Sequence, residues 1–300
     1  MWTDNNKVAN QSILTVTGDF DHSKLSRLID PLVSPDGPDN LVIDFRNVTF
    51  VSPLPVVSLI TMLSSDVVSN KDITFLCPRD SSRVQYLAAC GFLQHARKWI
   101  SIEGAGDLVE ALPSRSASTL LPLTCLDSKD DIEQIIHSVR SGLDSLMGHS
   151  SQRSVKKAIQ STIQELTANI FDHARTDIGW IYAQEYFNRY QQKSYVQIAI
   201  GDAGCGIRKS LATRFDEFDD INDSEALRRM LLEELSRRTS GTGGTGYQVL
   251  KKAAKENDGR FSLRSGTGEV KQYRGSNNVN ISDSTSSWPG TQLFISITYG

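Results

Sequence analysis

Glu165-Leu-Thr-Ala-Asn169-Ile-Phe-Asp-His173 is the stretch around which the second half of this sequence is organised. Apolar residues recur at helical spacing from about Val155 to His173, which predicts an amphipathic helix. Glu165, Asn169 and His173 step by four and form a polar stripe beside the apolar face. An Asn oxygen suits Mg²⁺, and a Glu one turn earlier can orient or deprotonate a water or a hydroxyl. A solvated helix face is the alternative interpretation of this stripe.

A second block follows the alternating apolar run from Tyr195 to Ile200, which predicts a strand. Asp202 stands at the end of that strand, where its carboxylate can accept a hydrogen bond from an amine. Gly204 and Gly206 lack a Cβ, so the backbone can turn sharply and approach a planar base closely. The alternative is an ordinary glycine turn between a strand and a loop.

The third block is the glycine-rich run from Gly241 to Gly246, which matches G-x-G-x-x-G. It follows a charged helix end rather than a buried strand, which argues against a dinucleotide-binding fold. No Lys-Ser or Lys-Thr follows the last glycine, which argues against a P-loop. A predicted helix from Tyr247 to Lys255 does follow, and a glycine-rich loop before a helix offers free N–H groups to phosphates. A flexible hinge is the alternative.

Together the blocks resemble the ATPase superfamily of DNA gyrase, heat-shock chaperones, sensor histidine kinases and mismatch-repair ATPases (GHKL). The matching residues fall into the family's N, G1 and G2 boxes and one further short signature: Glu165 and Asn169; Asp202, Gly204 and Gly206; Gly244 and Gly246; and Thr291 after Gly290. The glycine spacing of the G2 box departs from the family's usual pattern, because Thr245 stands where a glycine is expected.

This resemblance implies a Bergerat-type α/β sandwich over residues 119–300, with a mixed sheet and helices on one face. It implies that Asp202 binds adenine with support from Thr291, that Asn169 holds Mg²⁺, and that Glu165 is the general base. ATP and Mg²⁺ are the expected ligands, and residues 208–242 would be a mobile lid over the nucleotide. A homodimer would be usual for the superfamily.

The first third of the chain alternates strand and helix patterns, which predicts a small α/β domain over residues 1–100. Strand-like runs begin at Ser12, Asn40 and Asp72, and helical stretches extend from about Leu54 to Val68 and from Ser82 to Gly91. The apolar spacing from Leu41 to Val51, and the later run from Leu87 to Phe92, resemble the anti-sigma factor antagonist (STAS) domains.

One departure from the STAS pattern concerns the phosphorylatable segment, which in the family follows the second core strand and reads roughly Asp-Ser-Ser-Gly. Here the corresponding stretch is Ser52-Pro-Leu-Pro55. Ser52 or Ser58 could be a displaced acceptor, and a helix cap or a surface hydroxyl is the alternative role. The resemblance therefore implies a docking or sensing module rather than a phosphorylation switch.

Length and composition are consistent with two domains in 300 residues. The small, polar composition of residues 101–118 predicts a linker between them, followed by an entry strand from Leu120 to Leu126 and a helix from Ser128 to Met147. A polar segment from Gly275 to Ser287 predicts a disordered loop.

The net charge and the cysteine pattern limit which partners and which cell compartment are expected. A net charge of −3 and a pI near 6.0 give no basic footprint for nucleic acid. No run approaches the ~20 apolar residues of a membrane span. The four cysteines, Cys77, Cys90, Cys125 and Cys205, show no C-x-x-C spacing. A cytoplasmic protein with reduced thiols is expected.

Several functional hypotheses remain open from the sequence. The first is a regulatory ATP-binding protein that resembles anti-sigma factors and transfers phosphate to a Ser or Thr of a protein partner. The second is an ATP-driven conformational switch with slow hydrolysis and no phosphotransfer. A sensor histidine kinase is disfavoured because His137, the best-placed histidine, lacks an acidic neighbour. A non-enzymatic scaffold for a partner protein is the alternative from another class.

Overall fold

A computed structural model of the chain describes residues 11–34, 36–111, 118–128, 130–147, 152–171, 178–232, 245–276 and 278–300. The fold class is mixed α/β, with one parallel and one antiparallel sheet, as the sequence predicts. The chain divides into two compact units, Met1–Ser116 and Ala117–Gly300. In the part that the structure describes, no helix is both long and apolar enough to cross a membrane.

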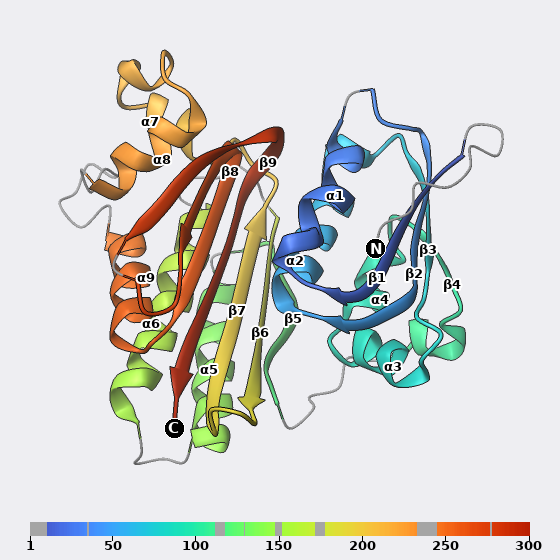
Figure 1. The fold of residues 1–300 in the computed structure, drawn as a ribbon, viewed down its shortest axis with the longest axis horizontal. Helices are drawn as coiled ribbons and strands as arrows, with labels where there is room; N and C mark the ends of the chain where they lie inside the picture. The colour runs from blue at the N-terminus through green and yellow to red at the C-terminus, as the bar shows by residue number, and fades with distance from the viewer. Residues whose placement is uncertain are drawn as a thin grey trace. The chain divides into compact units, whose positions relative to one another are not determined.

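The first unit contains a four-stranded parallel sheet in the order β1-β2-β3-β4. Its strands are β1 (Gln11–Phe20), β2 (Asn40–Val51), β3 (Asp72–Leu76) and β4 (Ser101–Glu103). The connections carry α1 (His22–Val33), α2 (Pro53–Leu63), α3 (Ser81–Ala89) and α4 (Phe92–Ala96) (Figure 1). Because parallel neighbours need crossover connections, the parallel pairing of these strands is consistent with the alternation of strands and helices in the sequence.

The core of the first unit is built on four phenylalanines, one from each of β1, β2, β3 and α4. The ring centroids of Phe20 and Phe45 are 5.1 Å apart, those of Phe45 and Phe75 4.7 Å, and those of Phe75 and Phe92 5.4 Å. Such tilted and edge-on pairs add to the free energy gained by burying the rings.

Helix α2 is buried along its whole length, as its almost uninterrupted apolar sequence requires. Ser52 stands at its N-cap position without a capping hydrogen bond from its side chain, and Pro53 opens the first turn. Ser52 is 7 % exposed and Ser58 is fully buried. A kinase could reach neither hydroxyl in this conformation, and the expectation of a surface hydroxyl is wrong.

The prediction of a linker over residues 101–118 is partly wrong. Ser101–Glu103 forms β4, which pairs with β3 through Thr74↔Ser101 and its neighbours. A 3₁₀ turn, η2 (Gly106–Val109), follows. Three residues are too few to show a strand pattern in the sequence, so the pairing with β3 decides their structure. Residues 112–117 lie outside the described part.

The second unit contains a five-stranded sheet in the order β5-β6-β7-β9-β8. Its strands are β5 (Thr119–Leu126), β6 (Gly179–Asn188), β7 (Lys193–Asp202), β8 (Arg260–Gln272) and β9 (Val279–Tyr299). Every neighbouring pair is antiparallel, so the expectation of a mixed sheet is wrong. Short connections join β6 to β7 and β8 to β9, and such hairpins can only produce antiparallel pairs.

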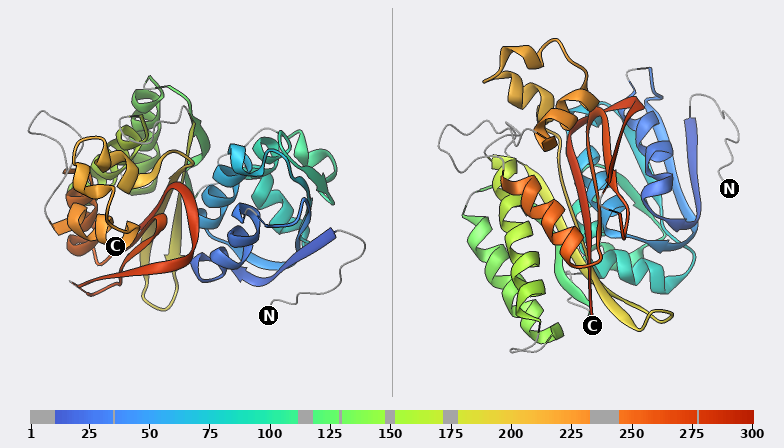
Figure 2. Two further views of the ribbon diagram at one scale, coloured as in Figure 1. Left: turned by 90° about the horizontal axis from the view of Figure 1, so that it is seen from above. Right: turned by 60° about the vertical axis from the view of Figure 1, so that its left-hand side comes forward.

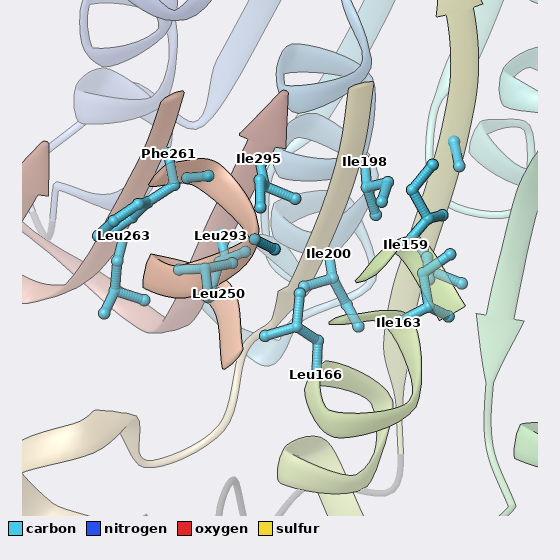
Figure 3. Close-up of a cluster of buried hydrophobic side chains, with 14 of the residues drawn as sticks. Ile159, Ile163, Leu166, Ile198, Ile200, Leu250, Phe261, Leu263, Leu293 and Ile295 are labelled. Carbon is cyan, nitrogen blue, oxygen red and sulfur yellow. The ribbon is translucent and has the colours of Figure 1, made fainter. Parts of the chain in front are cut away.

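Three helices pack on one face of this sheet: α5 (Asp131–Met147), α6 (Arg153–Asn169) and α9 (Thr245–Glu256) (Figures 1 and 2). The α6 residues Ile159, Ile163 and Leu166 meet Ile198 and Ile200 of β7 in a buried apolar cluster (Figure 3). Two shorter helices, α7 (Gly206–Ala212) and α8 (Asp223–Leu232), lie at the end of the sheet away from the C-terminus (Figure 1).

The prediction of a disordered loop from Gly275 to Ser287 is largely wrong. Strand β9 begins at Val279 and pairs with β8 from Gln272↔Val279 to Gly268↔Asp283. Val279 and Ile281 pack against the core cluster, while Asn280 between them and Ser282 after them are exposed. Alternation of this kind is typical of an antiparallel strand with one solvated face, and its many polar residues conceal it in the sequence.

The packing of α6 on the sheet makes a quantitative prediction. Ile163 is fully buried between α6 and β7, so Ile163→Ala removes apolar contacts and leaves a cavity. We expect the free energy of unfolding of the second unit to fall by about 2–5 kcal/mol, measured by urea denaturation followed by circular dichroism. The exposed neighbour is the control, since Gln164→Ala should change stability by less than about 0.5 kcal/mol. Equal effects of the two substitutions would contradict the packing.

Candidate functional site

A row of three polar residues crosses the end of the antiparallel sheet. Asp202 of β7 is the register partner of Thr291 of β9, and Thr291 is in turn the partner of Ser265 of β8. Partners in register point to the same side of a sheet, and residues two apart on a strand share a face. The row therefore lies on the helix-covered face, directly beyond an apolar row of the same strands: Ile200, Leu293 and Leu263.

The Asp202 carboxylate is buried, with 4 % of the residue exposed. Its Oδ1 accepts a hydrogen bond from the Gly204 backbone N–H at 2.9 Å, and the Thr291 backbone N–H also donates to the carboxylate. Burial raises the pKa of Asp202 to about 7, and the two hydrogen bonds oppose that rise. The site thus contains a carboxylate that is poised to change charge near neutral pH.

Two glycines with left-handed backbone allow the chain to close around this carboxylate. Gly206 has φ +76° and Gly290 has φ +65°. A Cβ at Gly290 would lie 2.1 Å from the backbone oxygen of Asp202, and one at Gly206 would lie 2.8 Å from the Ser265 Oγ. Only glycine fits both the conformation and the space at these positions. The predicted site residues Gly204, Gly206 and Thr291 therefore all lie beside Asp202.

The C-terminal end of α6 reaches the same end of the sheet. Ile170 follows the last residue of α6, and its side chain approaches Gly179 so closely that a Cβ there would lie 2.5 Å from Ile170 Cδ1. Gly179 is the register partner of Asp202 on β6. Asn169 is the last residue of α6, and Glu165 is half-buried one turn earlier. The Asn169 side chain and His173 lie outside the described residues.

The N-terminal end of α9 also meets this site. Burial and the nearby Asp202 charge both raise the pKa of the Tyr247 hydroxyl. Tyr247 is the third residue of α9 and packs against the apolar core. Gly246 therefore lies in the first turn of α9 rather than in the preceding loop, and Gly244 lies outside the described residues. Tyr247 was not predicted as a site residue, because its nearness to the Asp202 charge has no counterpart in sequence spacing.

Ser265 is a second residue that the sequence analysis missed. It is 3 % exposed, and its Oγ contacts backbone groups on both glycine turns. In the sequence it is one of two serines in a short run with apolar residues at Phe261 and Leu263, a pattern that carries no functional signal. Strand register alone places it in the row with Asp202.

Part of the segment expected to be a lid, residues 208–242, is helical and tied to the sheet. Arg208 Nε lies 3.0 Å from Asp223 Oδ1 at the start of α8, and the Thr267 N–H of β8 donates to Asp223 Oδ2 at 2.9 Å. Gly266, at a β-bulge of β8, leaves room for this contact because it has no Cβ. A Cβ there would lie 2.1 Å from Asp223 Oδ2. Residues 233–242 lie outside the described part, and lid motion stays a prediction.

The expected Mg²⁺ site can be tested only in part. Within the described ranges, no group of three or more His, Cys, Asp or Glu side chains is placed to hold a metal ion. Mg²⁺ bound with a nucleotide needs few protein ligands, since phosphate oxygens and water complete its shell. One Asn at the end of α6 is compatible with that donor set, and Asn169 as the Mg²⁺ ligand stays a prediction.

The raised pKa of Asp202 predicts a stability that depends on pH. The folded state binds the Asp202 proton more tightly than the unfolded chain does. Protonation of Asp202 therefore adds to the free energy of unfolding below about pH 4, and this contribution is lost as pH rises through about 7. Asp202→Asn removes the buried charge, so we expect it to match wild type near pH 4. Near pH 8 it should be more stable by a few kcal/mol. Thermal melts across this range measure the difference, and a pH-independent difference would contradict the burial of the carboxylate.

No family model matches this sequence, and no curated protein matches it. The proposal for function therefore depends on the residues and the geometry of the site.

Proposed function

We propose that residues 119–300 bind Mg-ATP, with the adenine amine donating to the Asp202 carboxylate. The observation that carries this proposal is the buried carboxylate at the end of β7, held by backbone donors and enclosed by two left-handed glycines. In this proposal Gly204 and Gly206 let the backbone approach the base. Gly244 and Gly246 approach the phosphates at the start of α9. Asn169 holds the Mg²⁺ that neutralises the phosphate charge.

The free-energy cost of burying the Asp202 carboxylate supports a functional role for this residue. Among the described residues no Lys or Arg pairs with its carboxylate, and the raised pKa reports that burial disfavours the charged form. Above about pH 7, where Asp202 is ionised, a neutral side chain that still accepts the two N–H donors would avoid this cost. Groups that a fold retains at the expense of its stability cluster at binding and catalytic sites.

The biological role in this proposal is that of a signalling protein acting on a protein partner. A cytoplasmic location is favoured because none of the four cysteines, all within the described ranges, forms a disulfide. With Glu165 as general base, the site would transfer phosphate to a partner's Ser or Thr. The burial of Ser52 and Ser58 favours a second candidate function, an ATP-driven switch, because the first unit then offers no accessible acceptor at either position.

Adenine recognition by Asp202 predicts a loss of affinity in a neutral variant. We expect Asp202→Asn to weaken ATP binding at least about tenfold near pH 8, because a hydrogen bond to a charged acceptor is replaced by a weaker one. Wild-type affinity should rise as pH increases through about 7, where the carboxylate ionises, and the variant should lack this rise. Calorimetric titration measures both effects. Wild-type affinity in Asp202→Asn at every pH would contradict the assignment.

Phosphotransfer and switching are separated by following the γ-phosphate of labelled ATP. Purified protein, Mg²⁺ and a lysate of the source cell are combined, with Glu165→Ala as the matched variant. Removing a general base should lower turnover by about 10²–10⁴-fold while ATP binding is preserved. Label on a lysate protein, lost with Glu165→Ala, indicates a kinase, and release of free phosphate alone indicates the switch. Unchanged turnover in the variant would exclude Glu165 as the base.

A further inference from the structure

One buried hydroxyl joins the two turns that frame the proposed adenine site. Ser265 Oγ accepts a hydrogen bond from the Ile207 backbone N–H at 2.8 Å and donates to the Gly290 carbonyl oxygen at 2.9 Å. Ile207 directly follows the left-handed Gly206, and Gly290 directly precedes Thr291. Ser265 therefore fastens the turn after β7 to a second, irregular turn of the backbone within β9, at Gly290, where the register between β8 and β9 shifts.

Both turns supply the groups that hold the Asp202 carboxylate in place. The Gly204 N–H on the first turn donates to Oδ1 at 2.9 Å, and the Thr291 N–H beside the second turn donates to the same carboxylate. The Gln292 amide also donates to the Asp202 backbone oxygen at 3.2 Å. A displacement of either turn would move one of these donors and would change where the carboxylate points.

We infer that Ser265 is a positioning residue that determines the selectivity of this site for 6-aminopurines. The inference rests on the proposed function, because Asp202 is the group that would accept the amine. Ser265 acts through the two turns and does not itself contact the nucleotide. Its hydroxyl keeps the acceptor where an amine can meet it.

Alanine cannot replace the two hydrogen bonds of this hydroxyl. Ser265→Ala would leave the Ile207 N–H and the Gly290 carbonyl without their partner, and buried backbone groups seldom remain unpaired. The turns would therefore shift to find other partners.

The test compares ATP with purine riboside triphosphate, which lacks only the 6-amino group, in calorimetric titrations near pH 8. We expect wild-type protein to prefer ATP by roughly tenfold, the value of one net hydrogen bond. Ser265→Ala should bind the amine-free analogue as wild type does but lose most of its preference for ATP. Ser262→Ala, on the same strand and half-buried, is the matched control and should keep the preference.

The outcomes distinguish this inference from the proposed function. An unchanged preference in Ser265→Ala, or an equal loss of affinity for both nucleotides, overturns the positioning role alone. Wild-type protein that binds neither nucleotide, or does not prefer ATP, overturns the proposed function and this inference with it. If Ser265→Ala does not fold, Ser265→Cys takes its place, since the thiol has a similar size and is a much weaker hydrogen-bonding group.

Discussion

The burial of the Asp202 carboxylate at the end of an apolar sheet face is the constraint on which the site depends. A charge in such a place must be satisfied by nearby donors or it protonates. Here the donors are backbone N–H groups, which can converge only if the chain turns tightly on both sides of the carboxylate. That requirement explains the left-handed glycines Gly206 and Gly290, and it explains why a buried hydroxyl, Ser265, bridges the turns that carry them.

The same constraint links binding to stability. With its pKa raised to about 7, Asp202 costs the folded state free energy whenever it is ionised. A ligand amine that donates to the carboxylate would stabilise the charged form and recover part of that cost. Binding would then both order the site and shift its protonation, because any ligand that prefers the folded state stabilises it. In the proposed complex the ligand would add a third donor to the two backbone N–H groups that the protein supplies.

Sequence periodicity predicted most of the fold, because α5, α6 and α9 and the strands β2, β5 and β7 carry strong apolar patterns of their own. Three predictions failed where pairing partners decide the structure. Ser101–Glu103 is too short to show a pattern, the polar start of β9 becomes a strand only beside β8, and the antiparallel sheet follows from hairpin connections. For the candidate site, the sequence blocks and their resemblance to the GHKL motifs pointed to Asp202, Gly204, Gly206 and Thr291. Ser265 and Tyr247 could not be found, since only strand register and helix packing bring them to Asp202.

The orientation of the two helices beside Asp202 gives the site an electrical polarity. The C-terminal end of α6 reaches Gly179, the partner of Asp202, while the N-terminal end of α9 brings Tyr247 to the same carboxylate. A helix carries partial negative charge at its C-terminus and partial positive charge at its N-terminus. Anionic groups of a ligand are therefore favoured beside α9 and a cation beside α6. A nucleotide whose base meets Asp202 would have its phosphates at the start of α9, and the metal ion bound to those phosphates would lie on their Asn169 side.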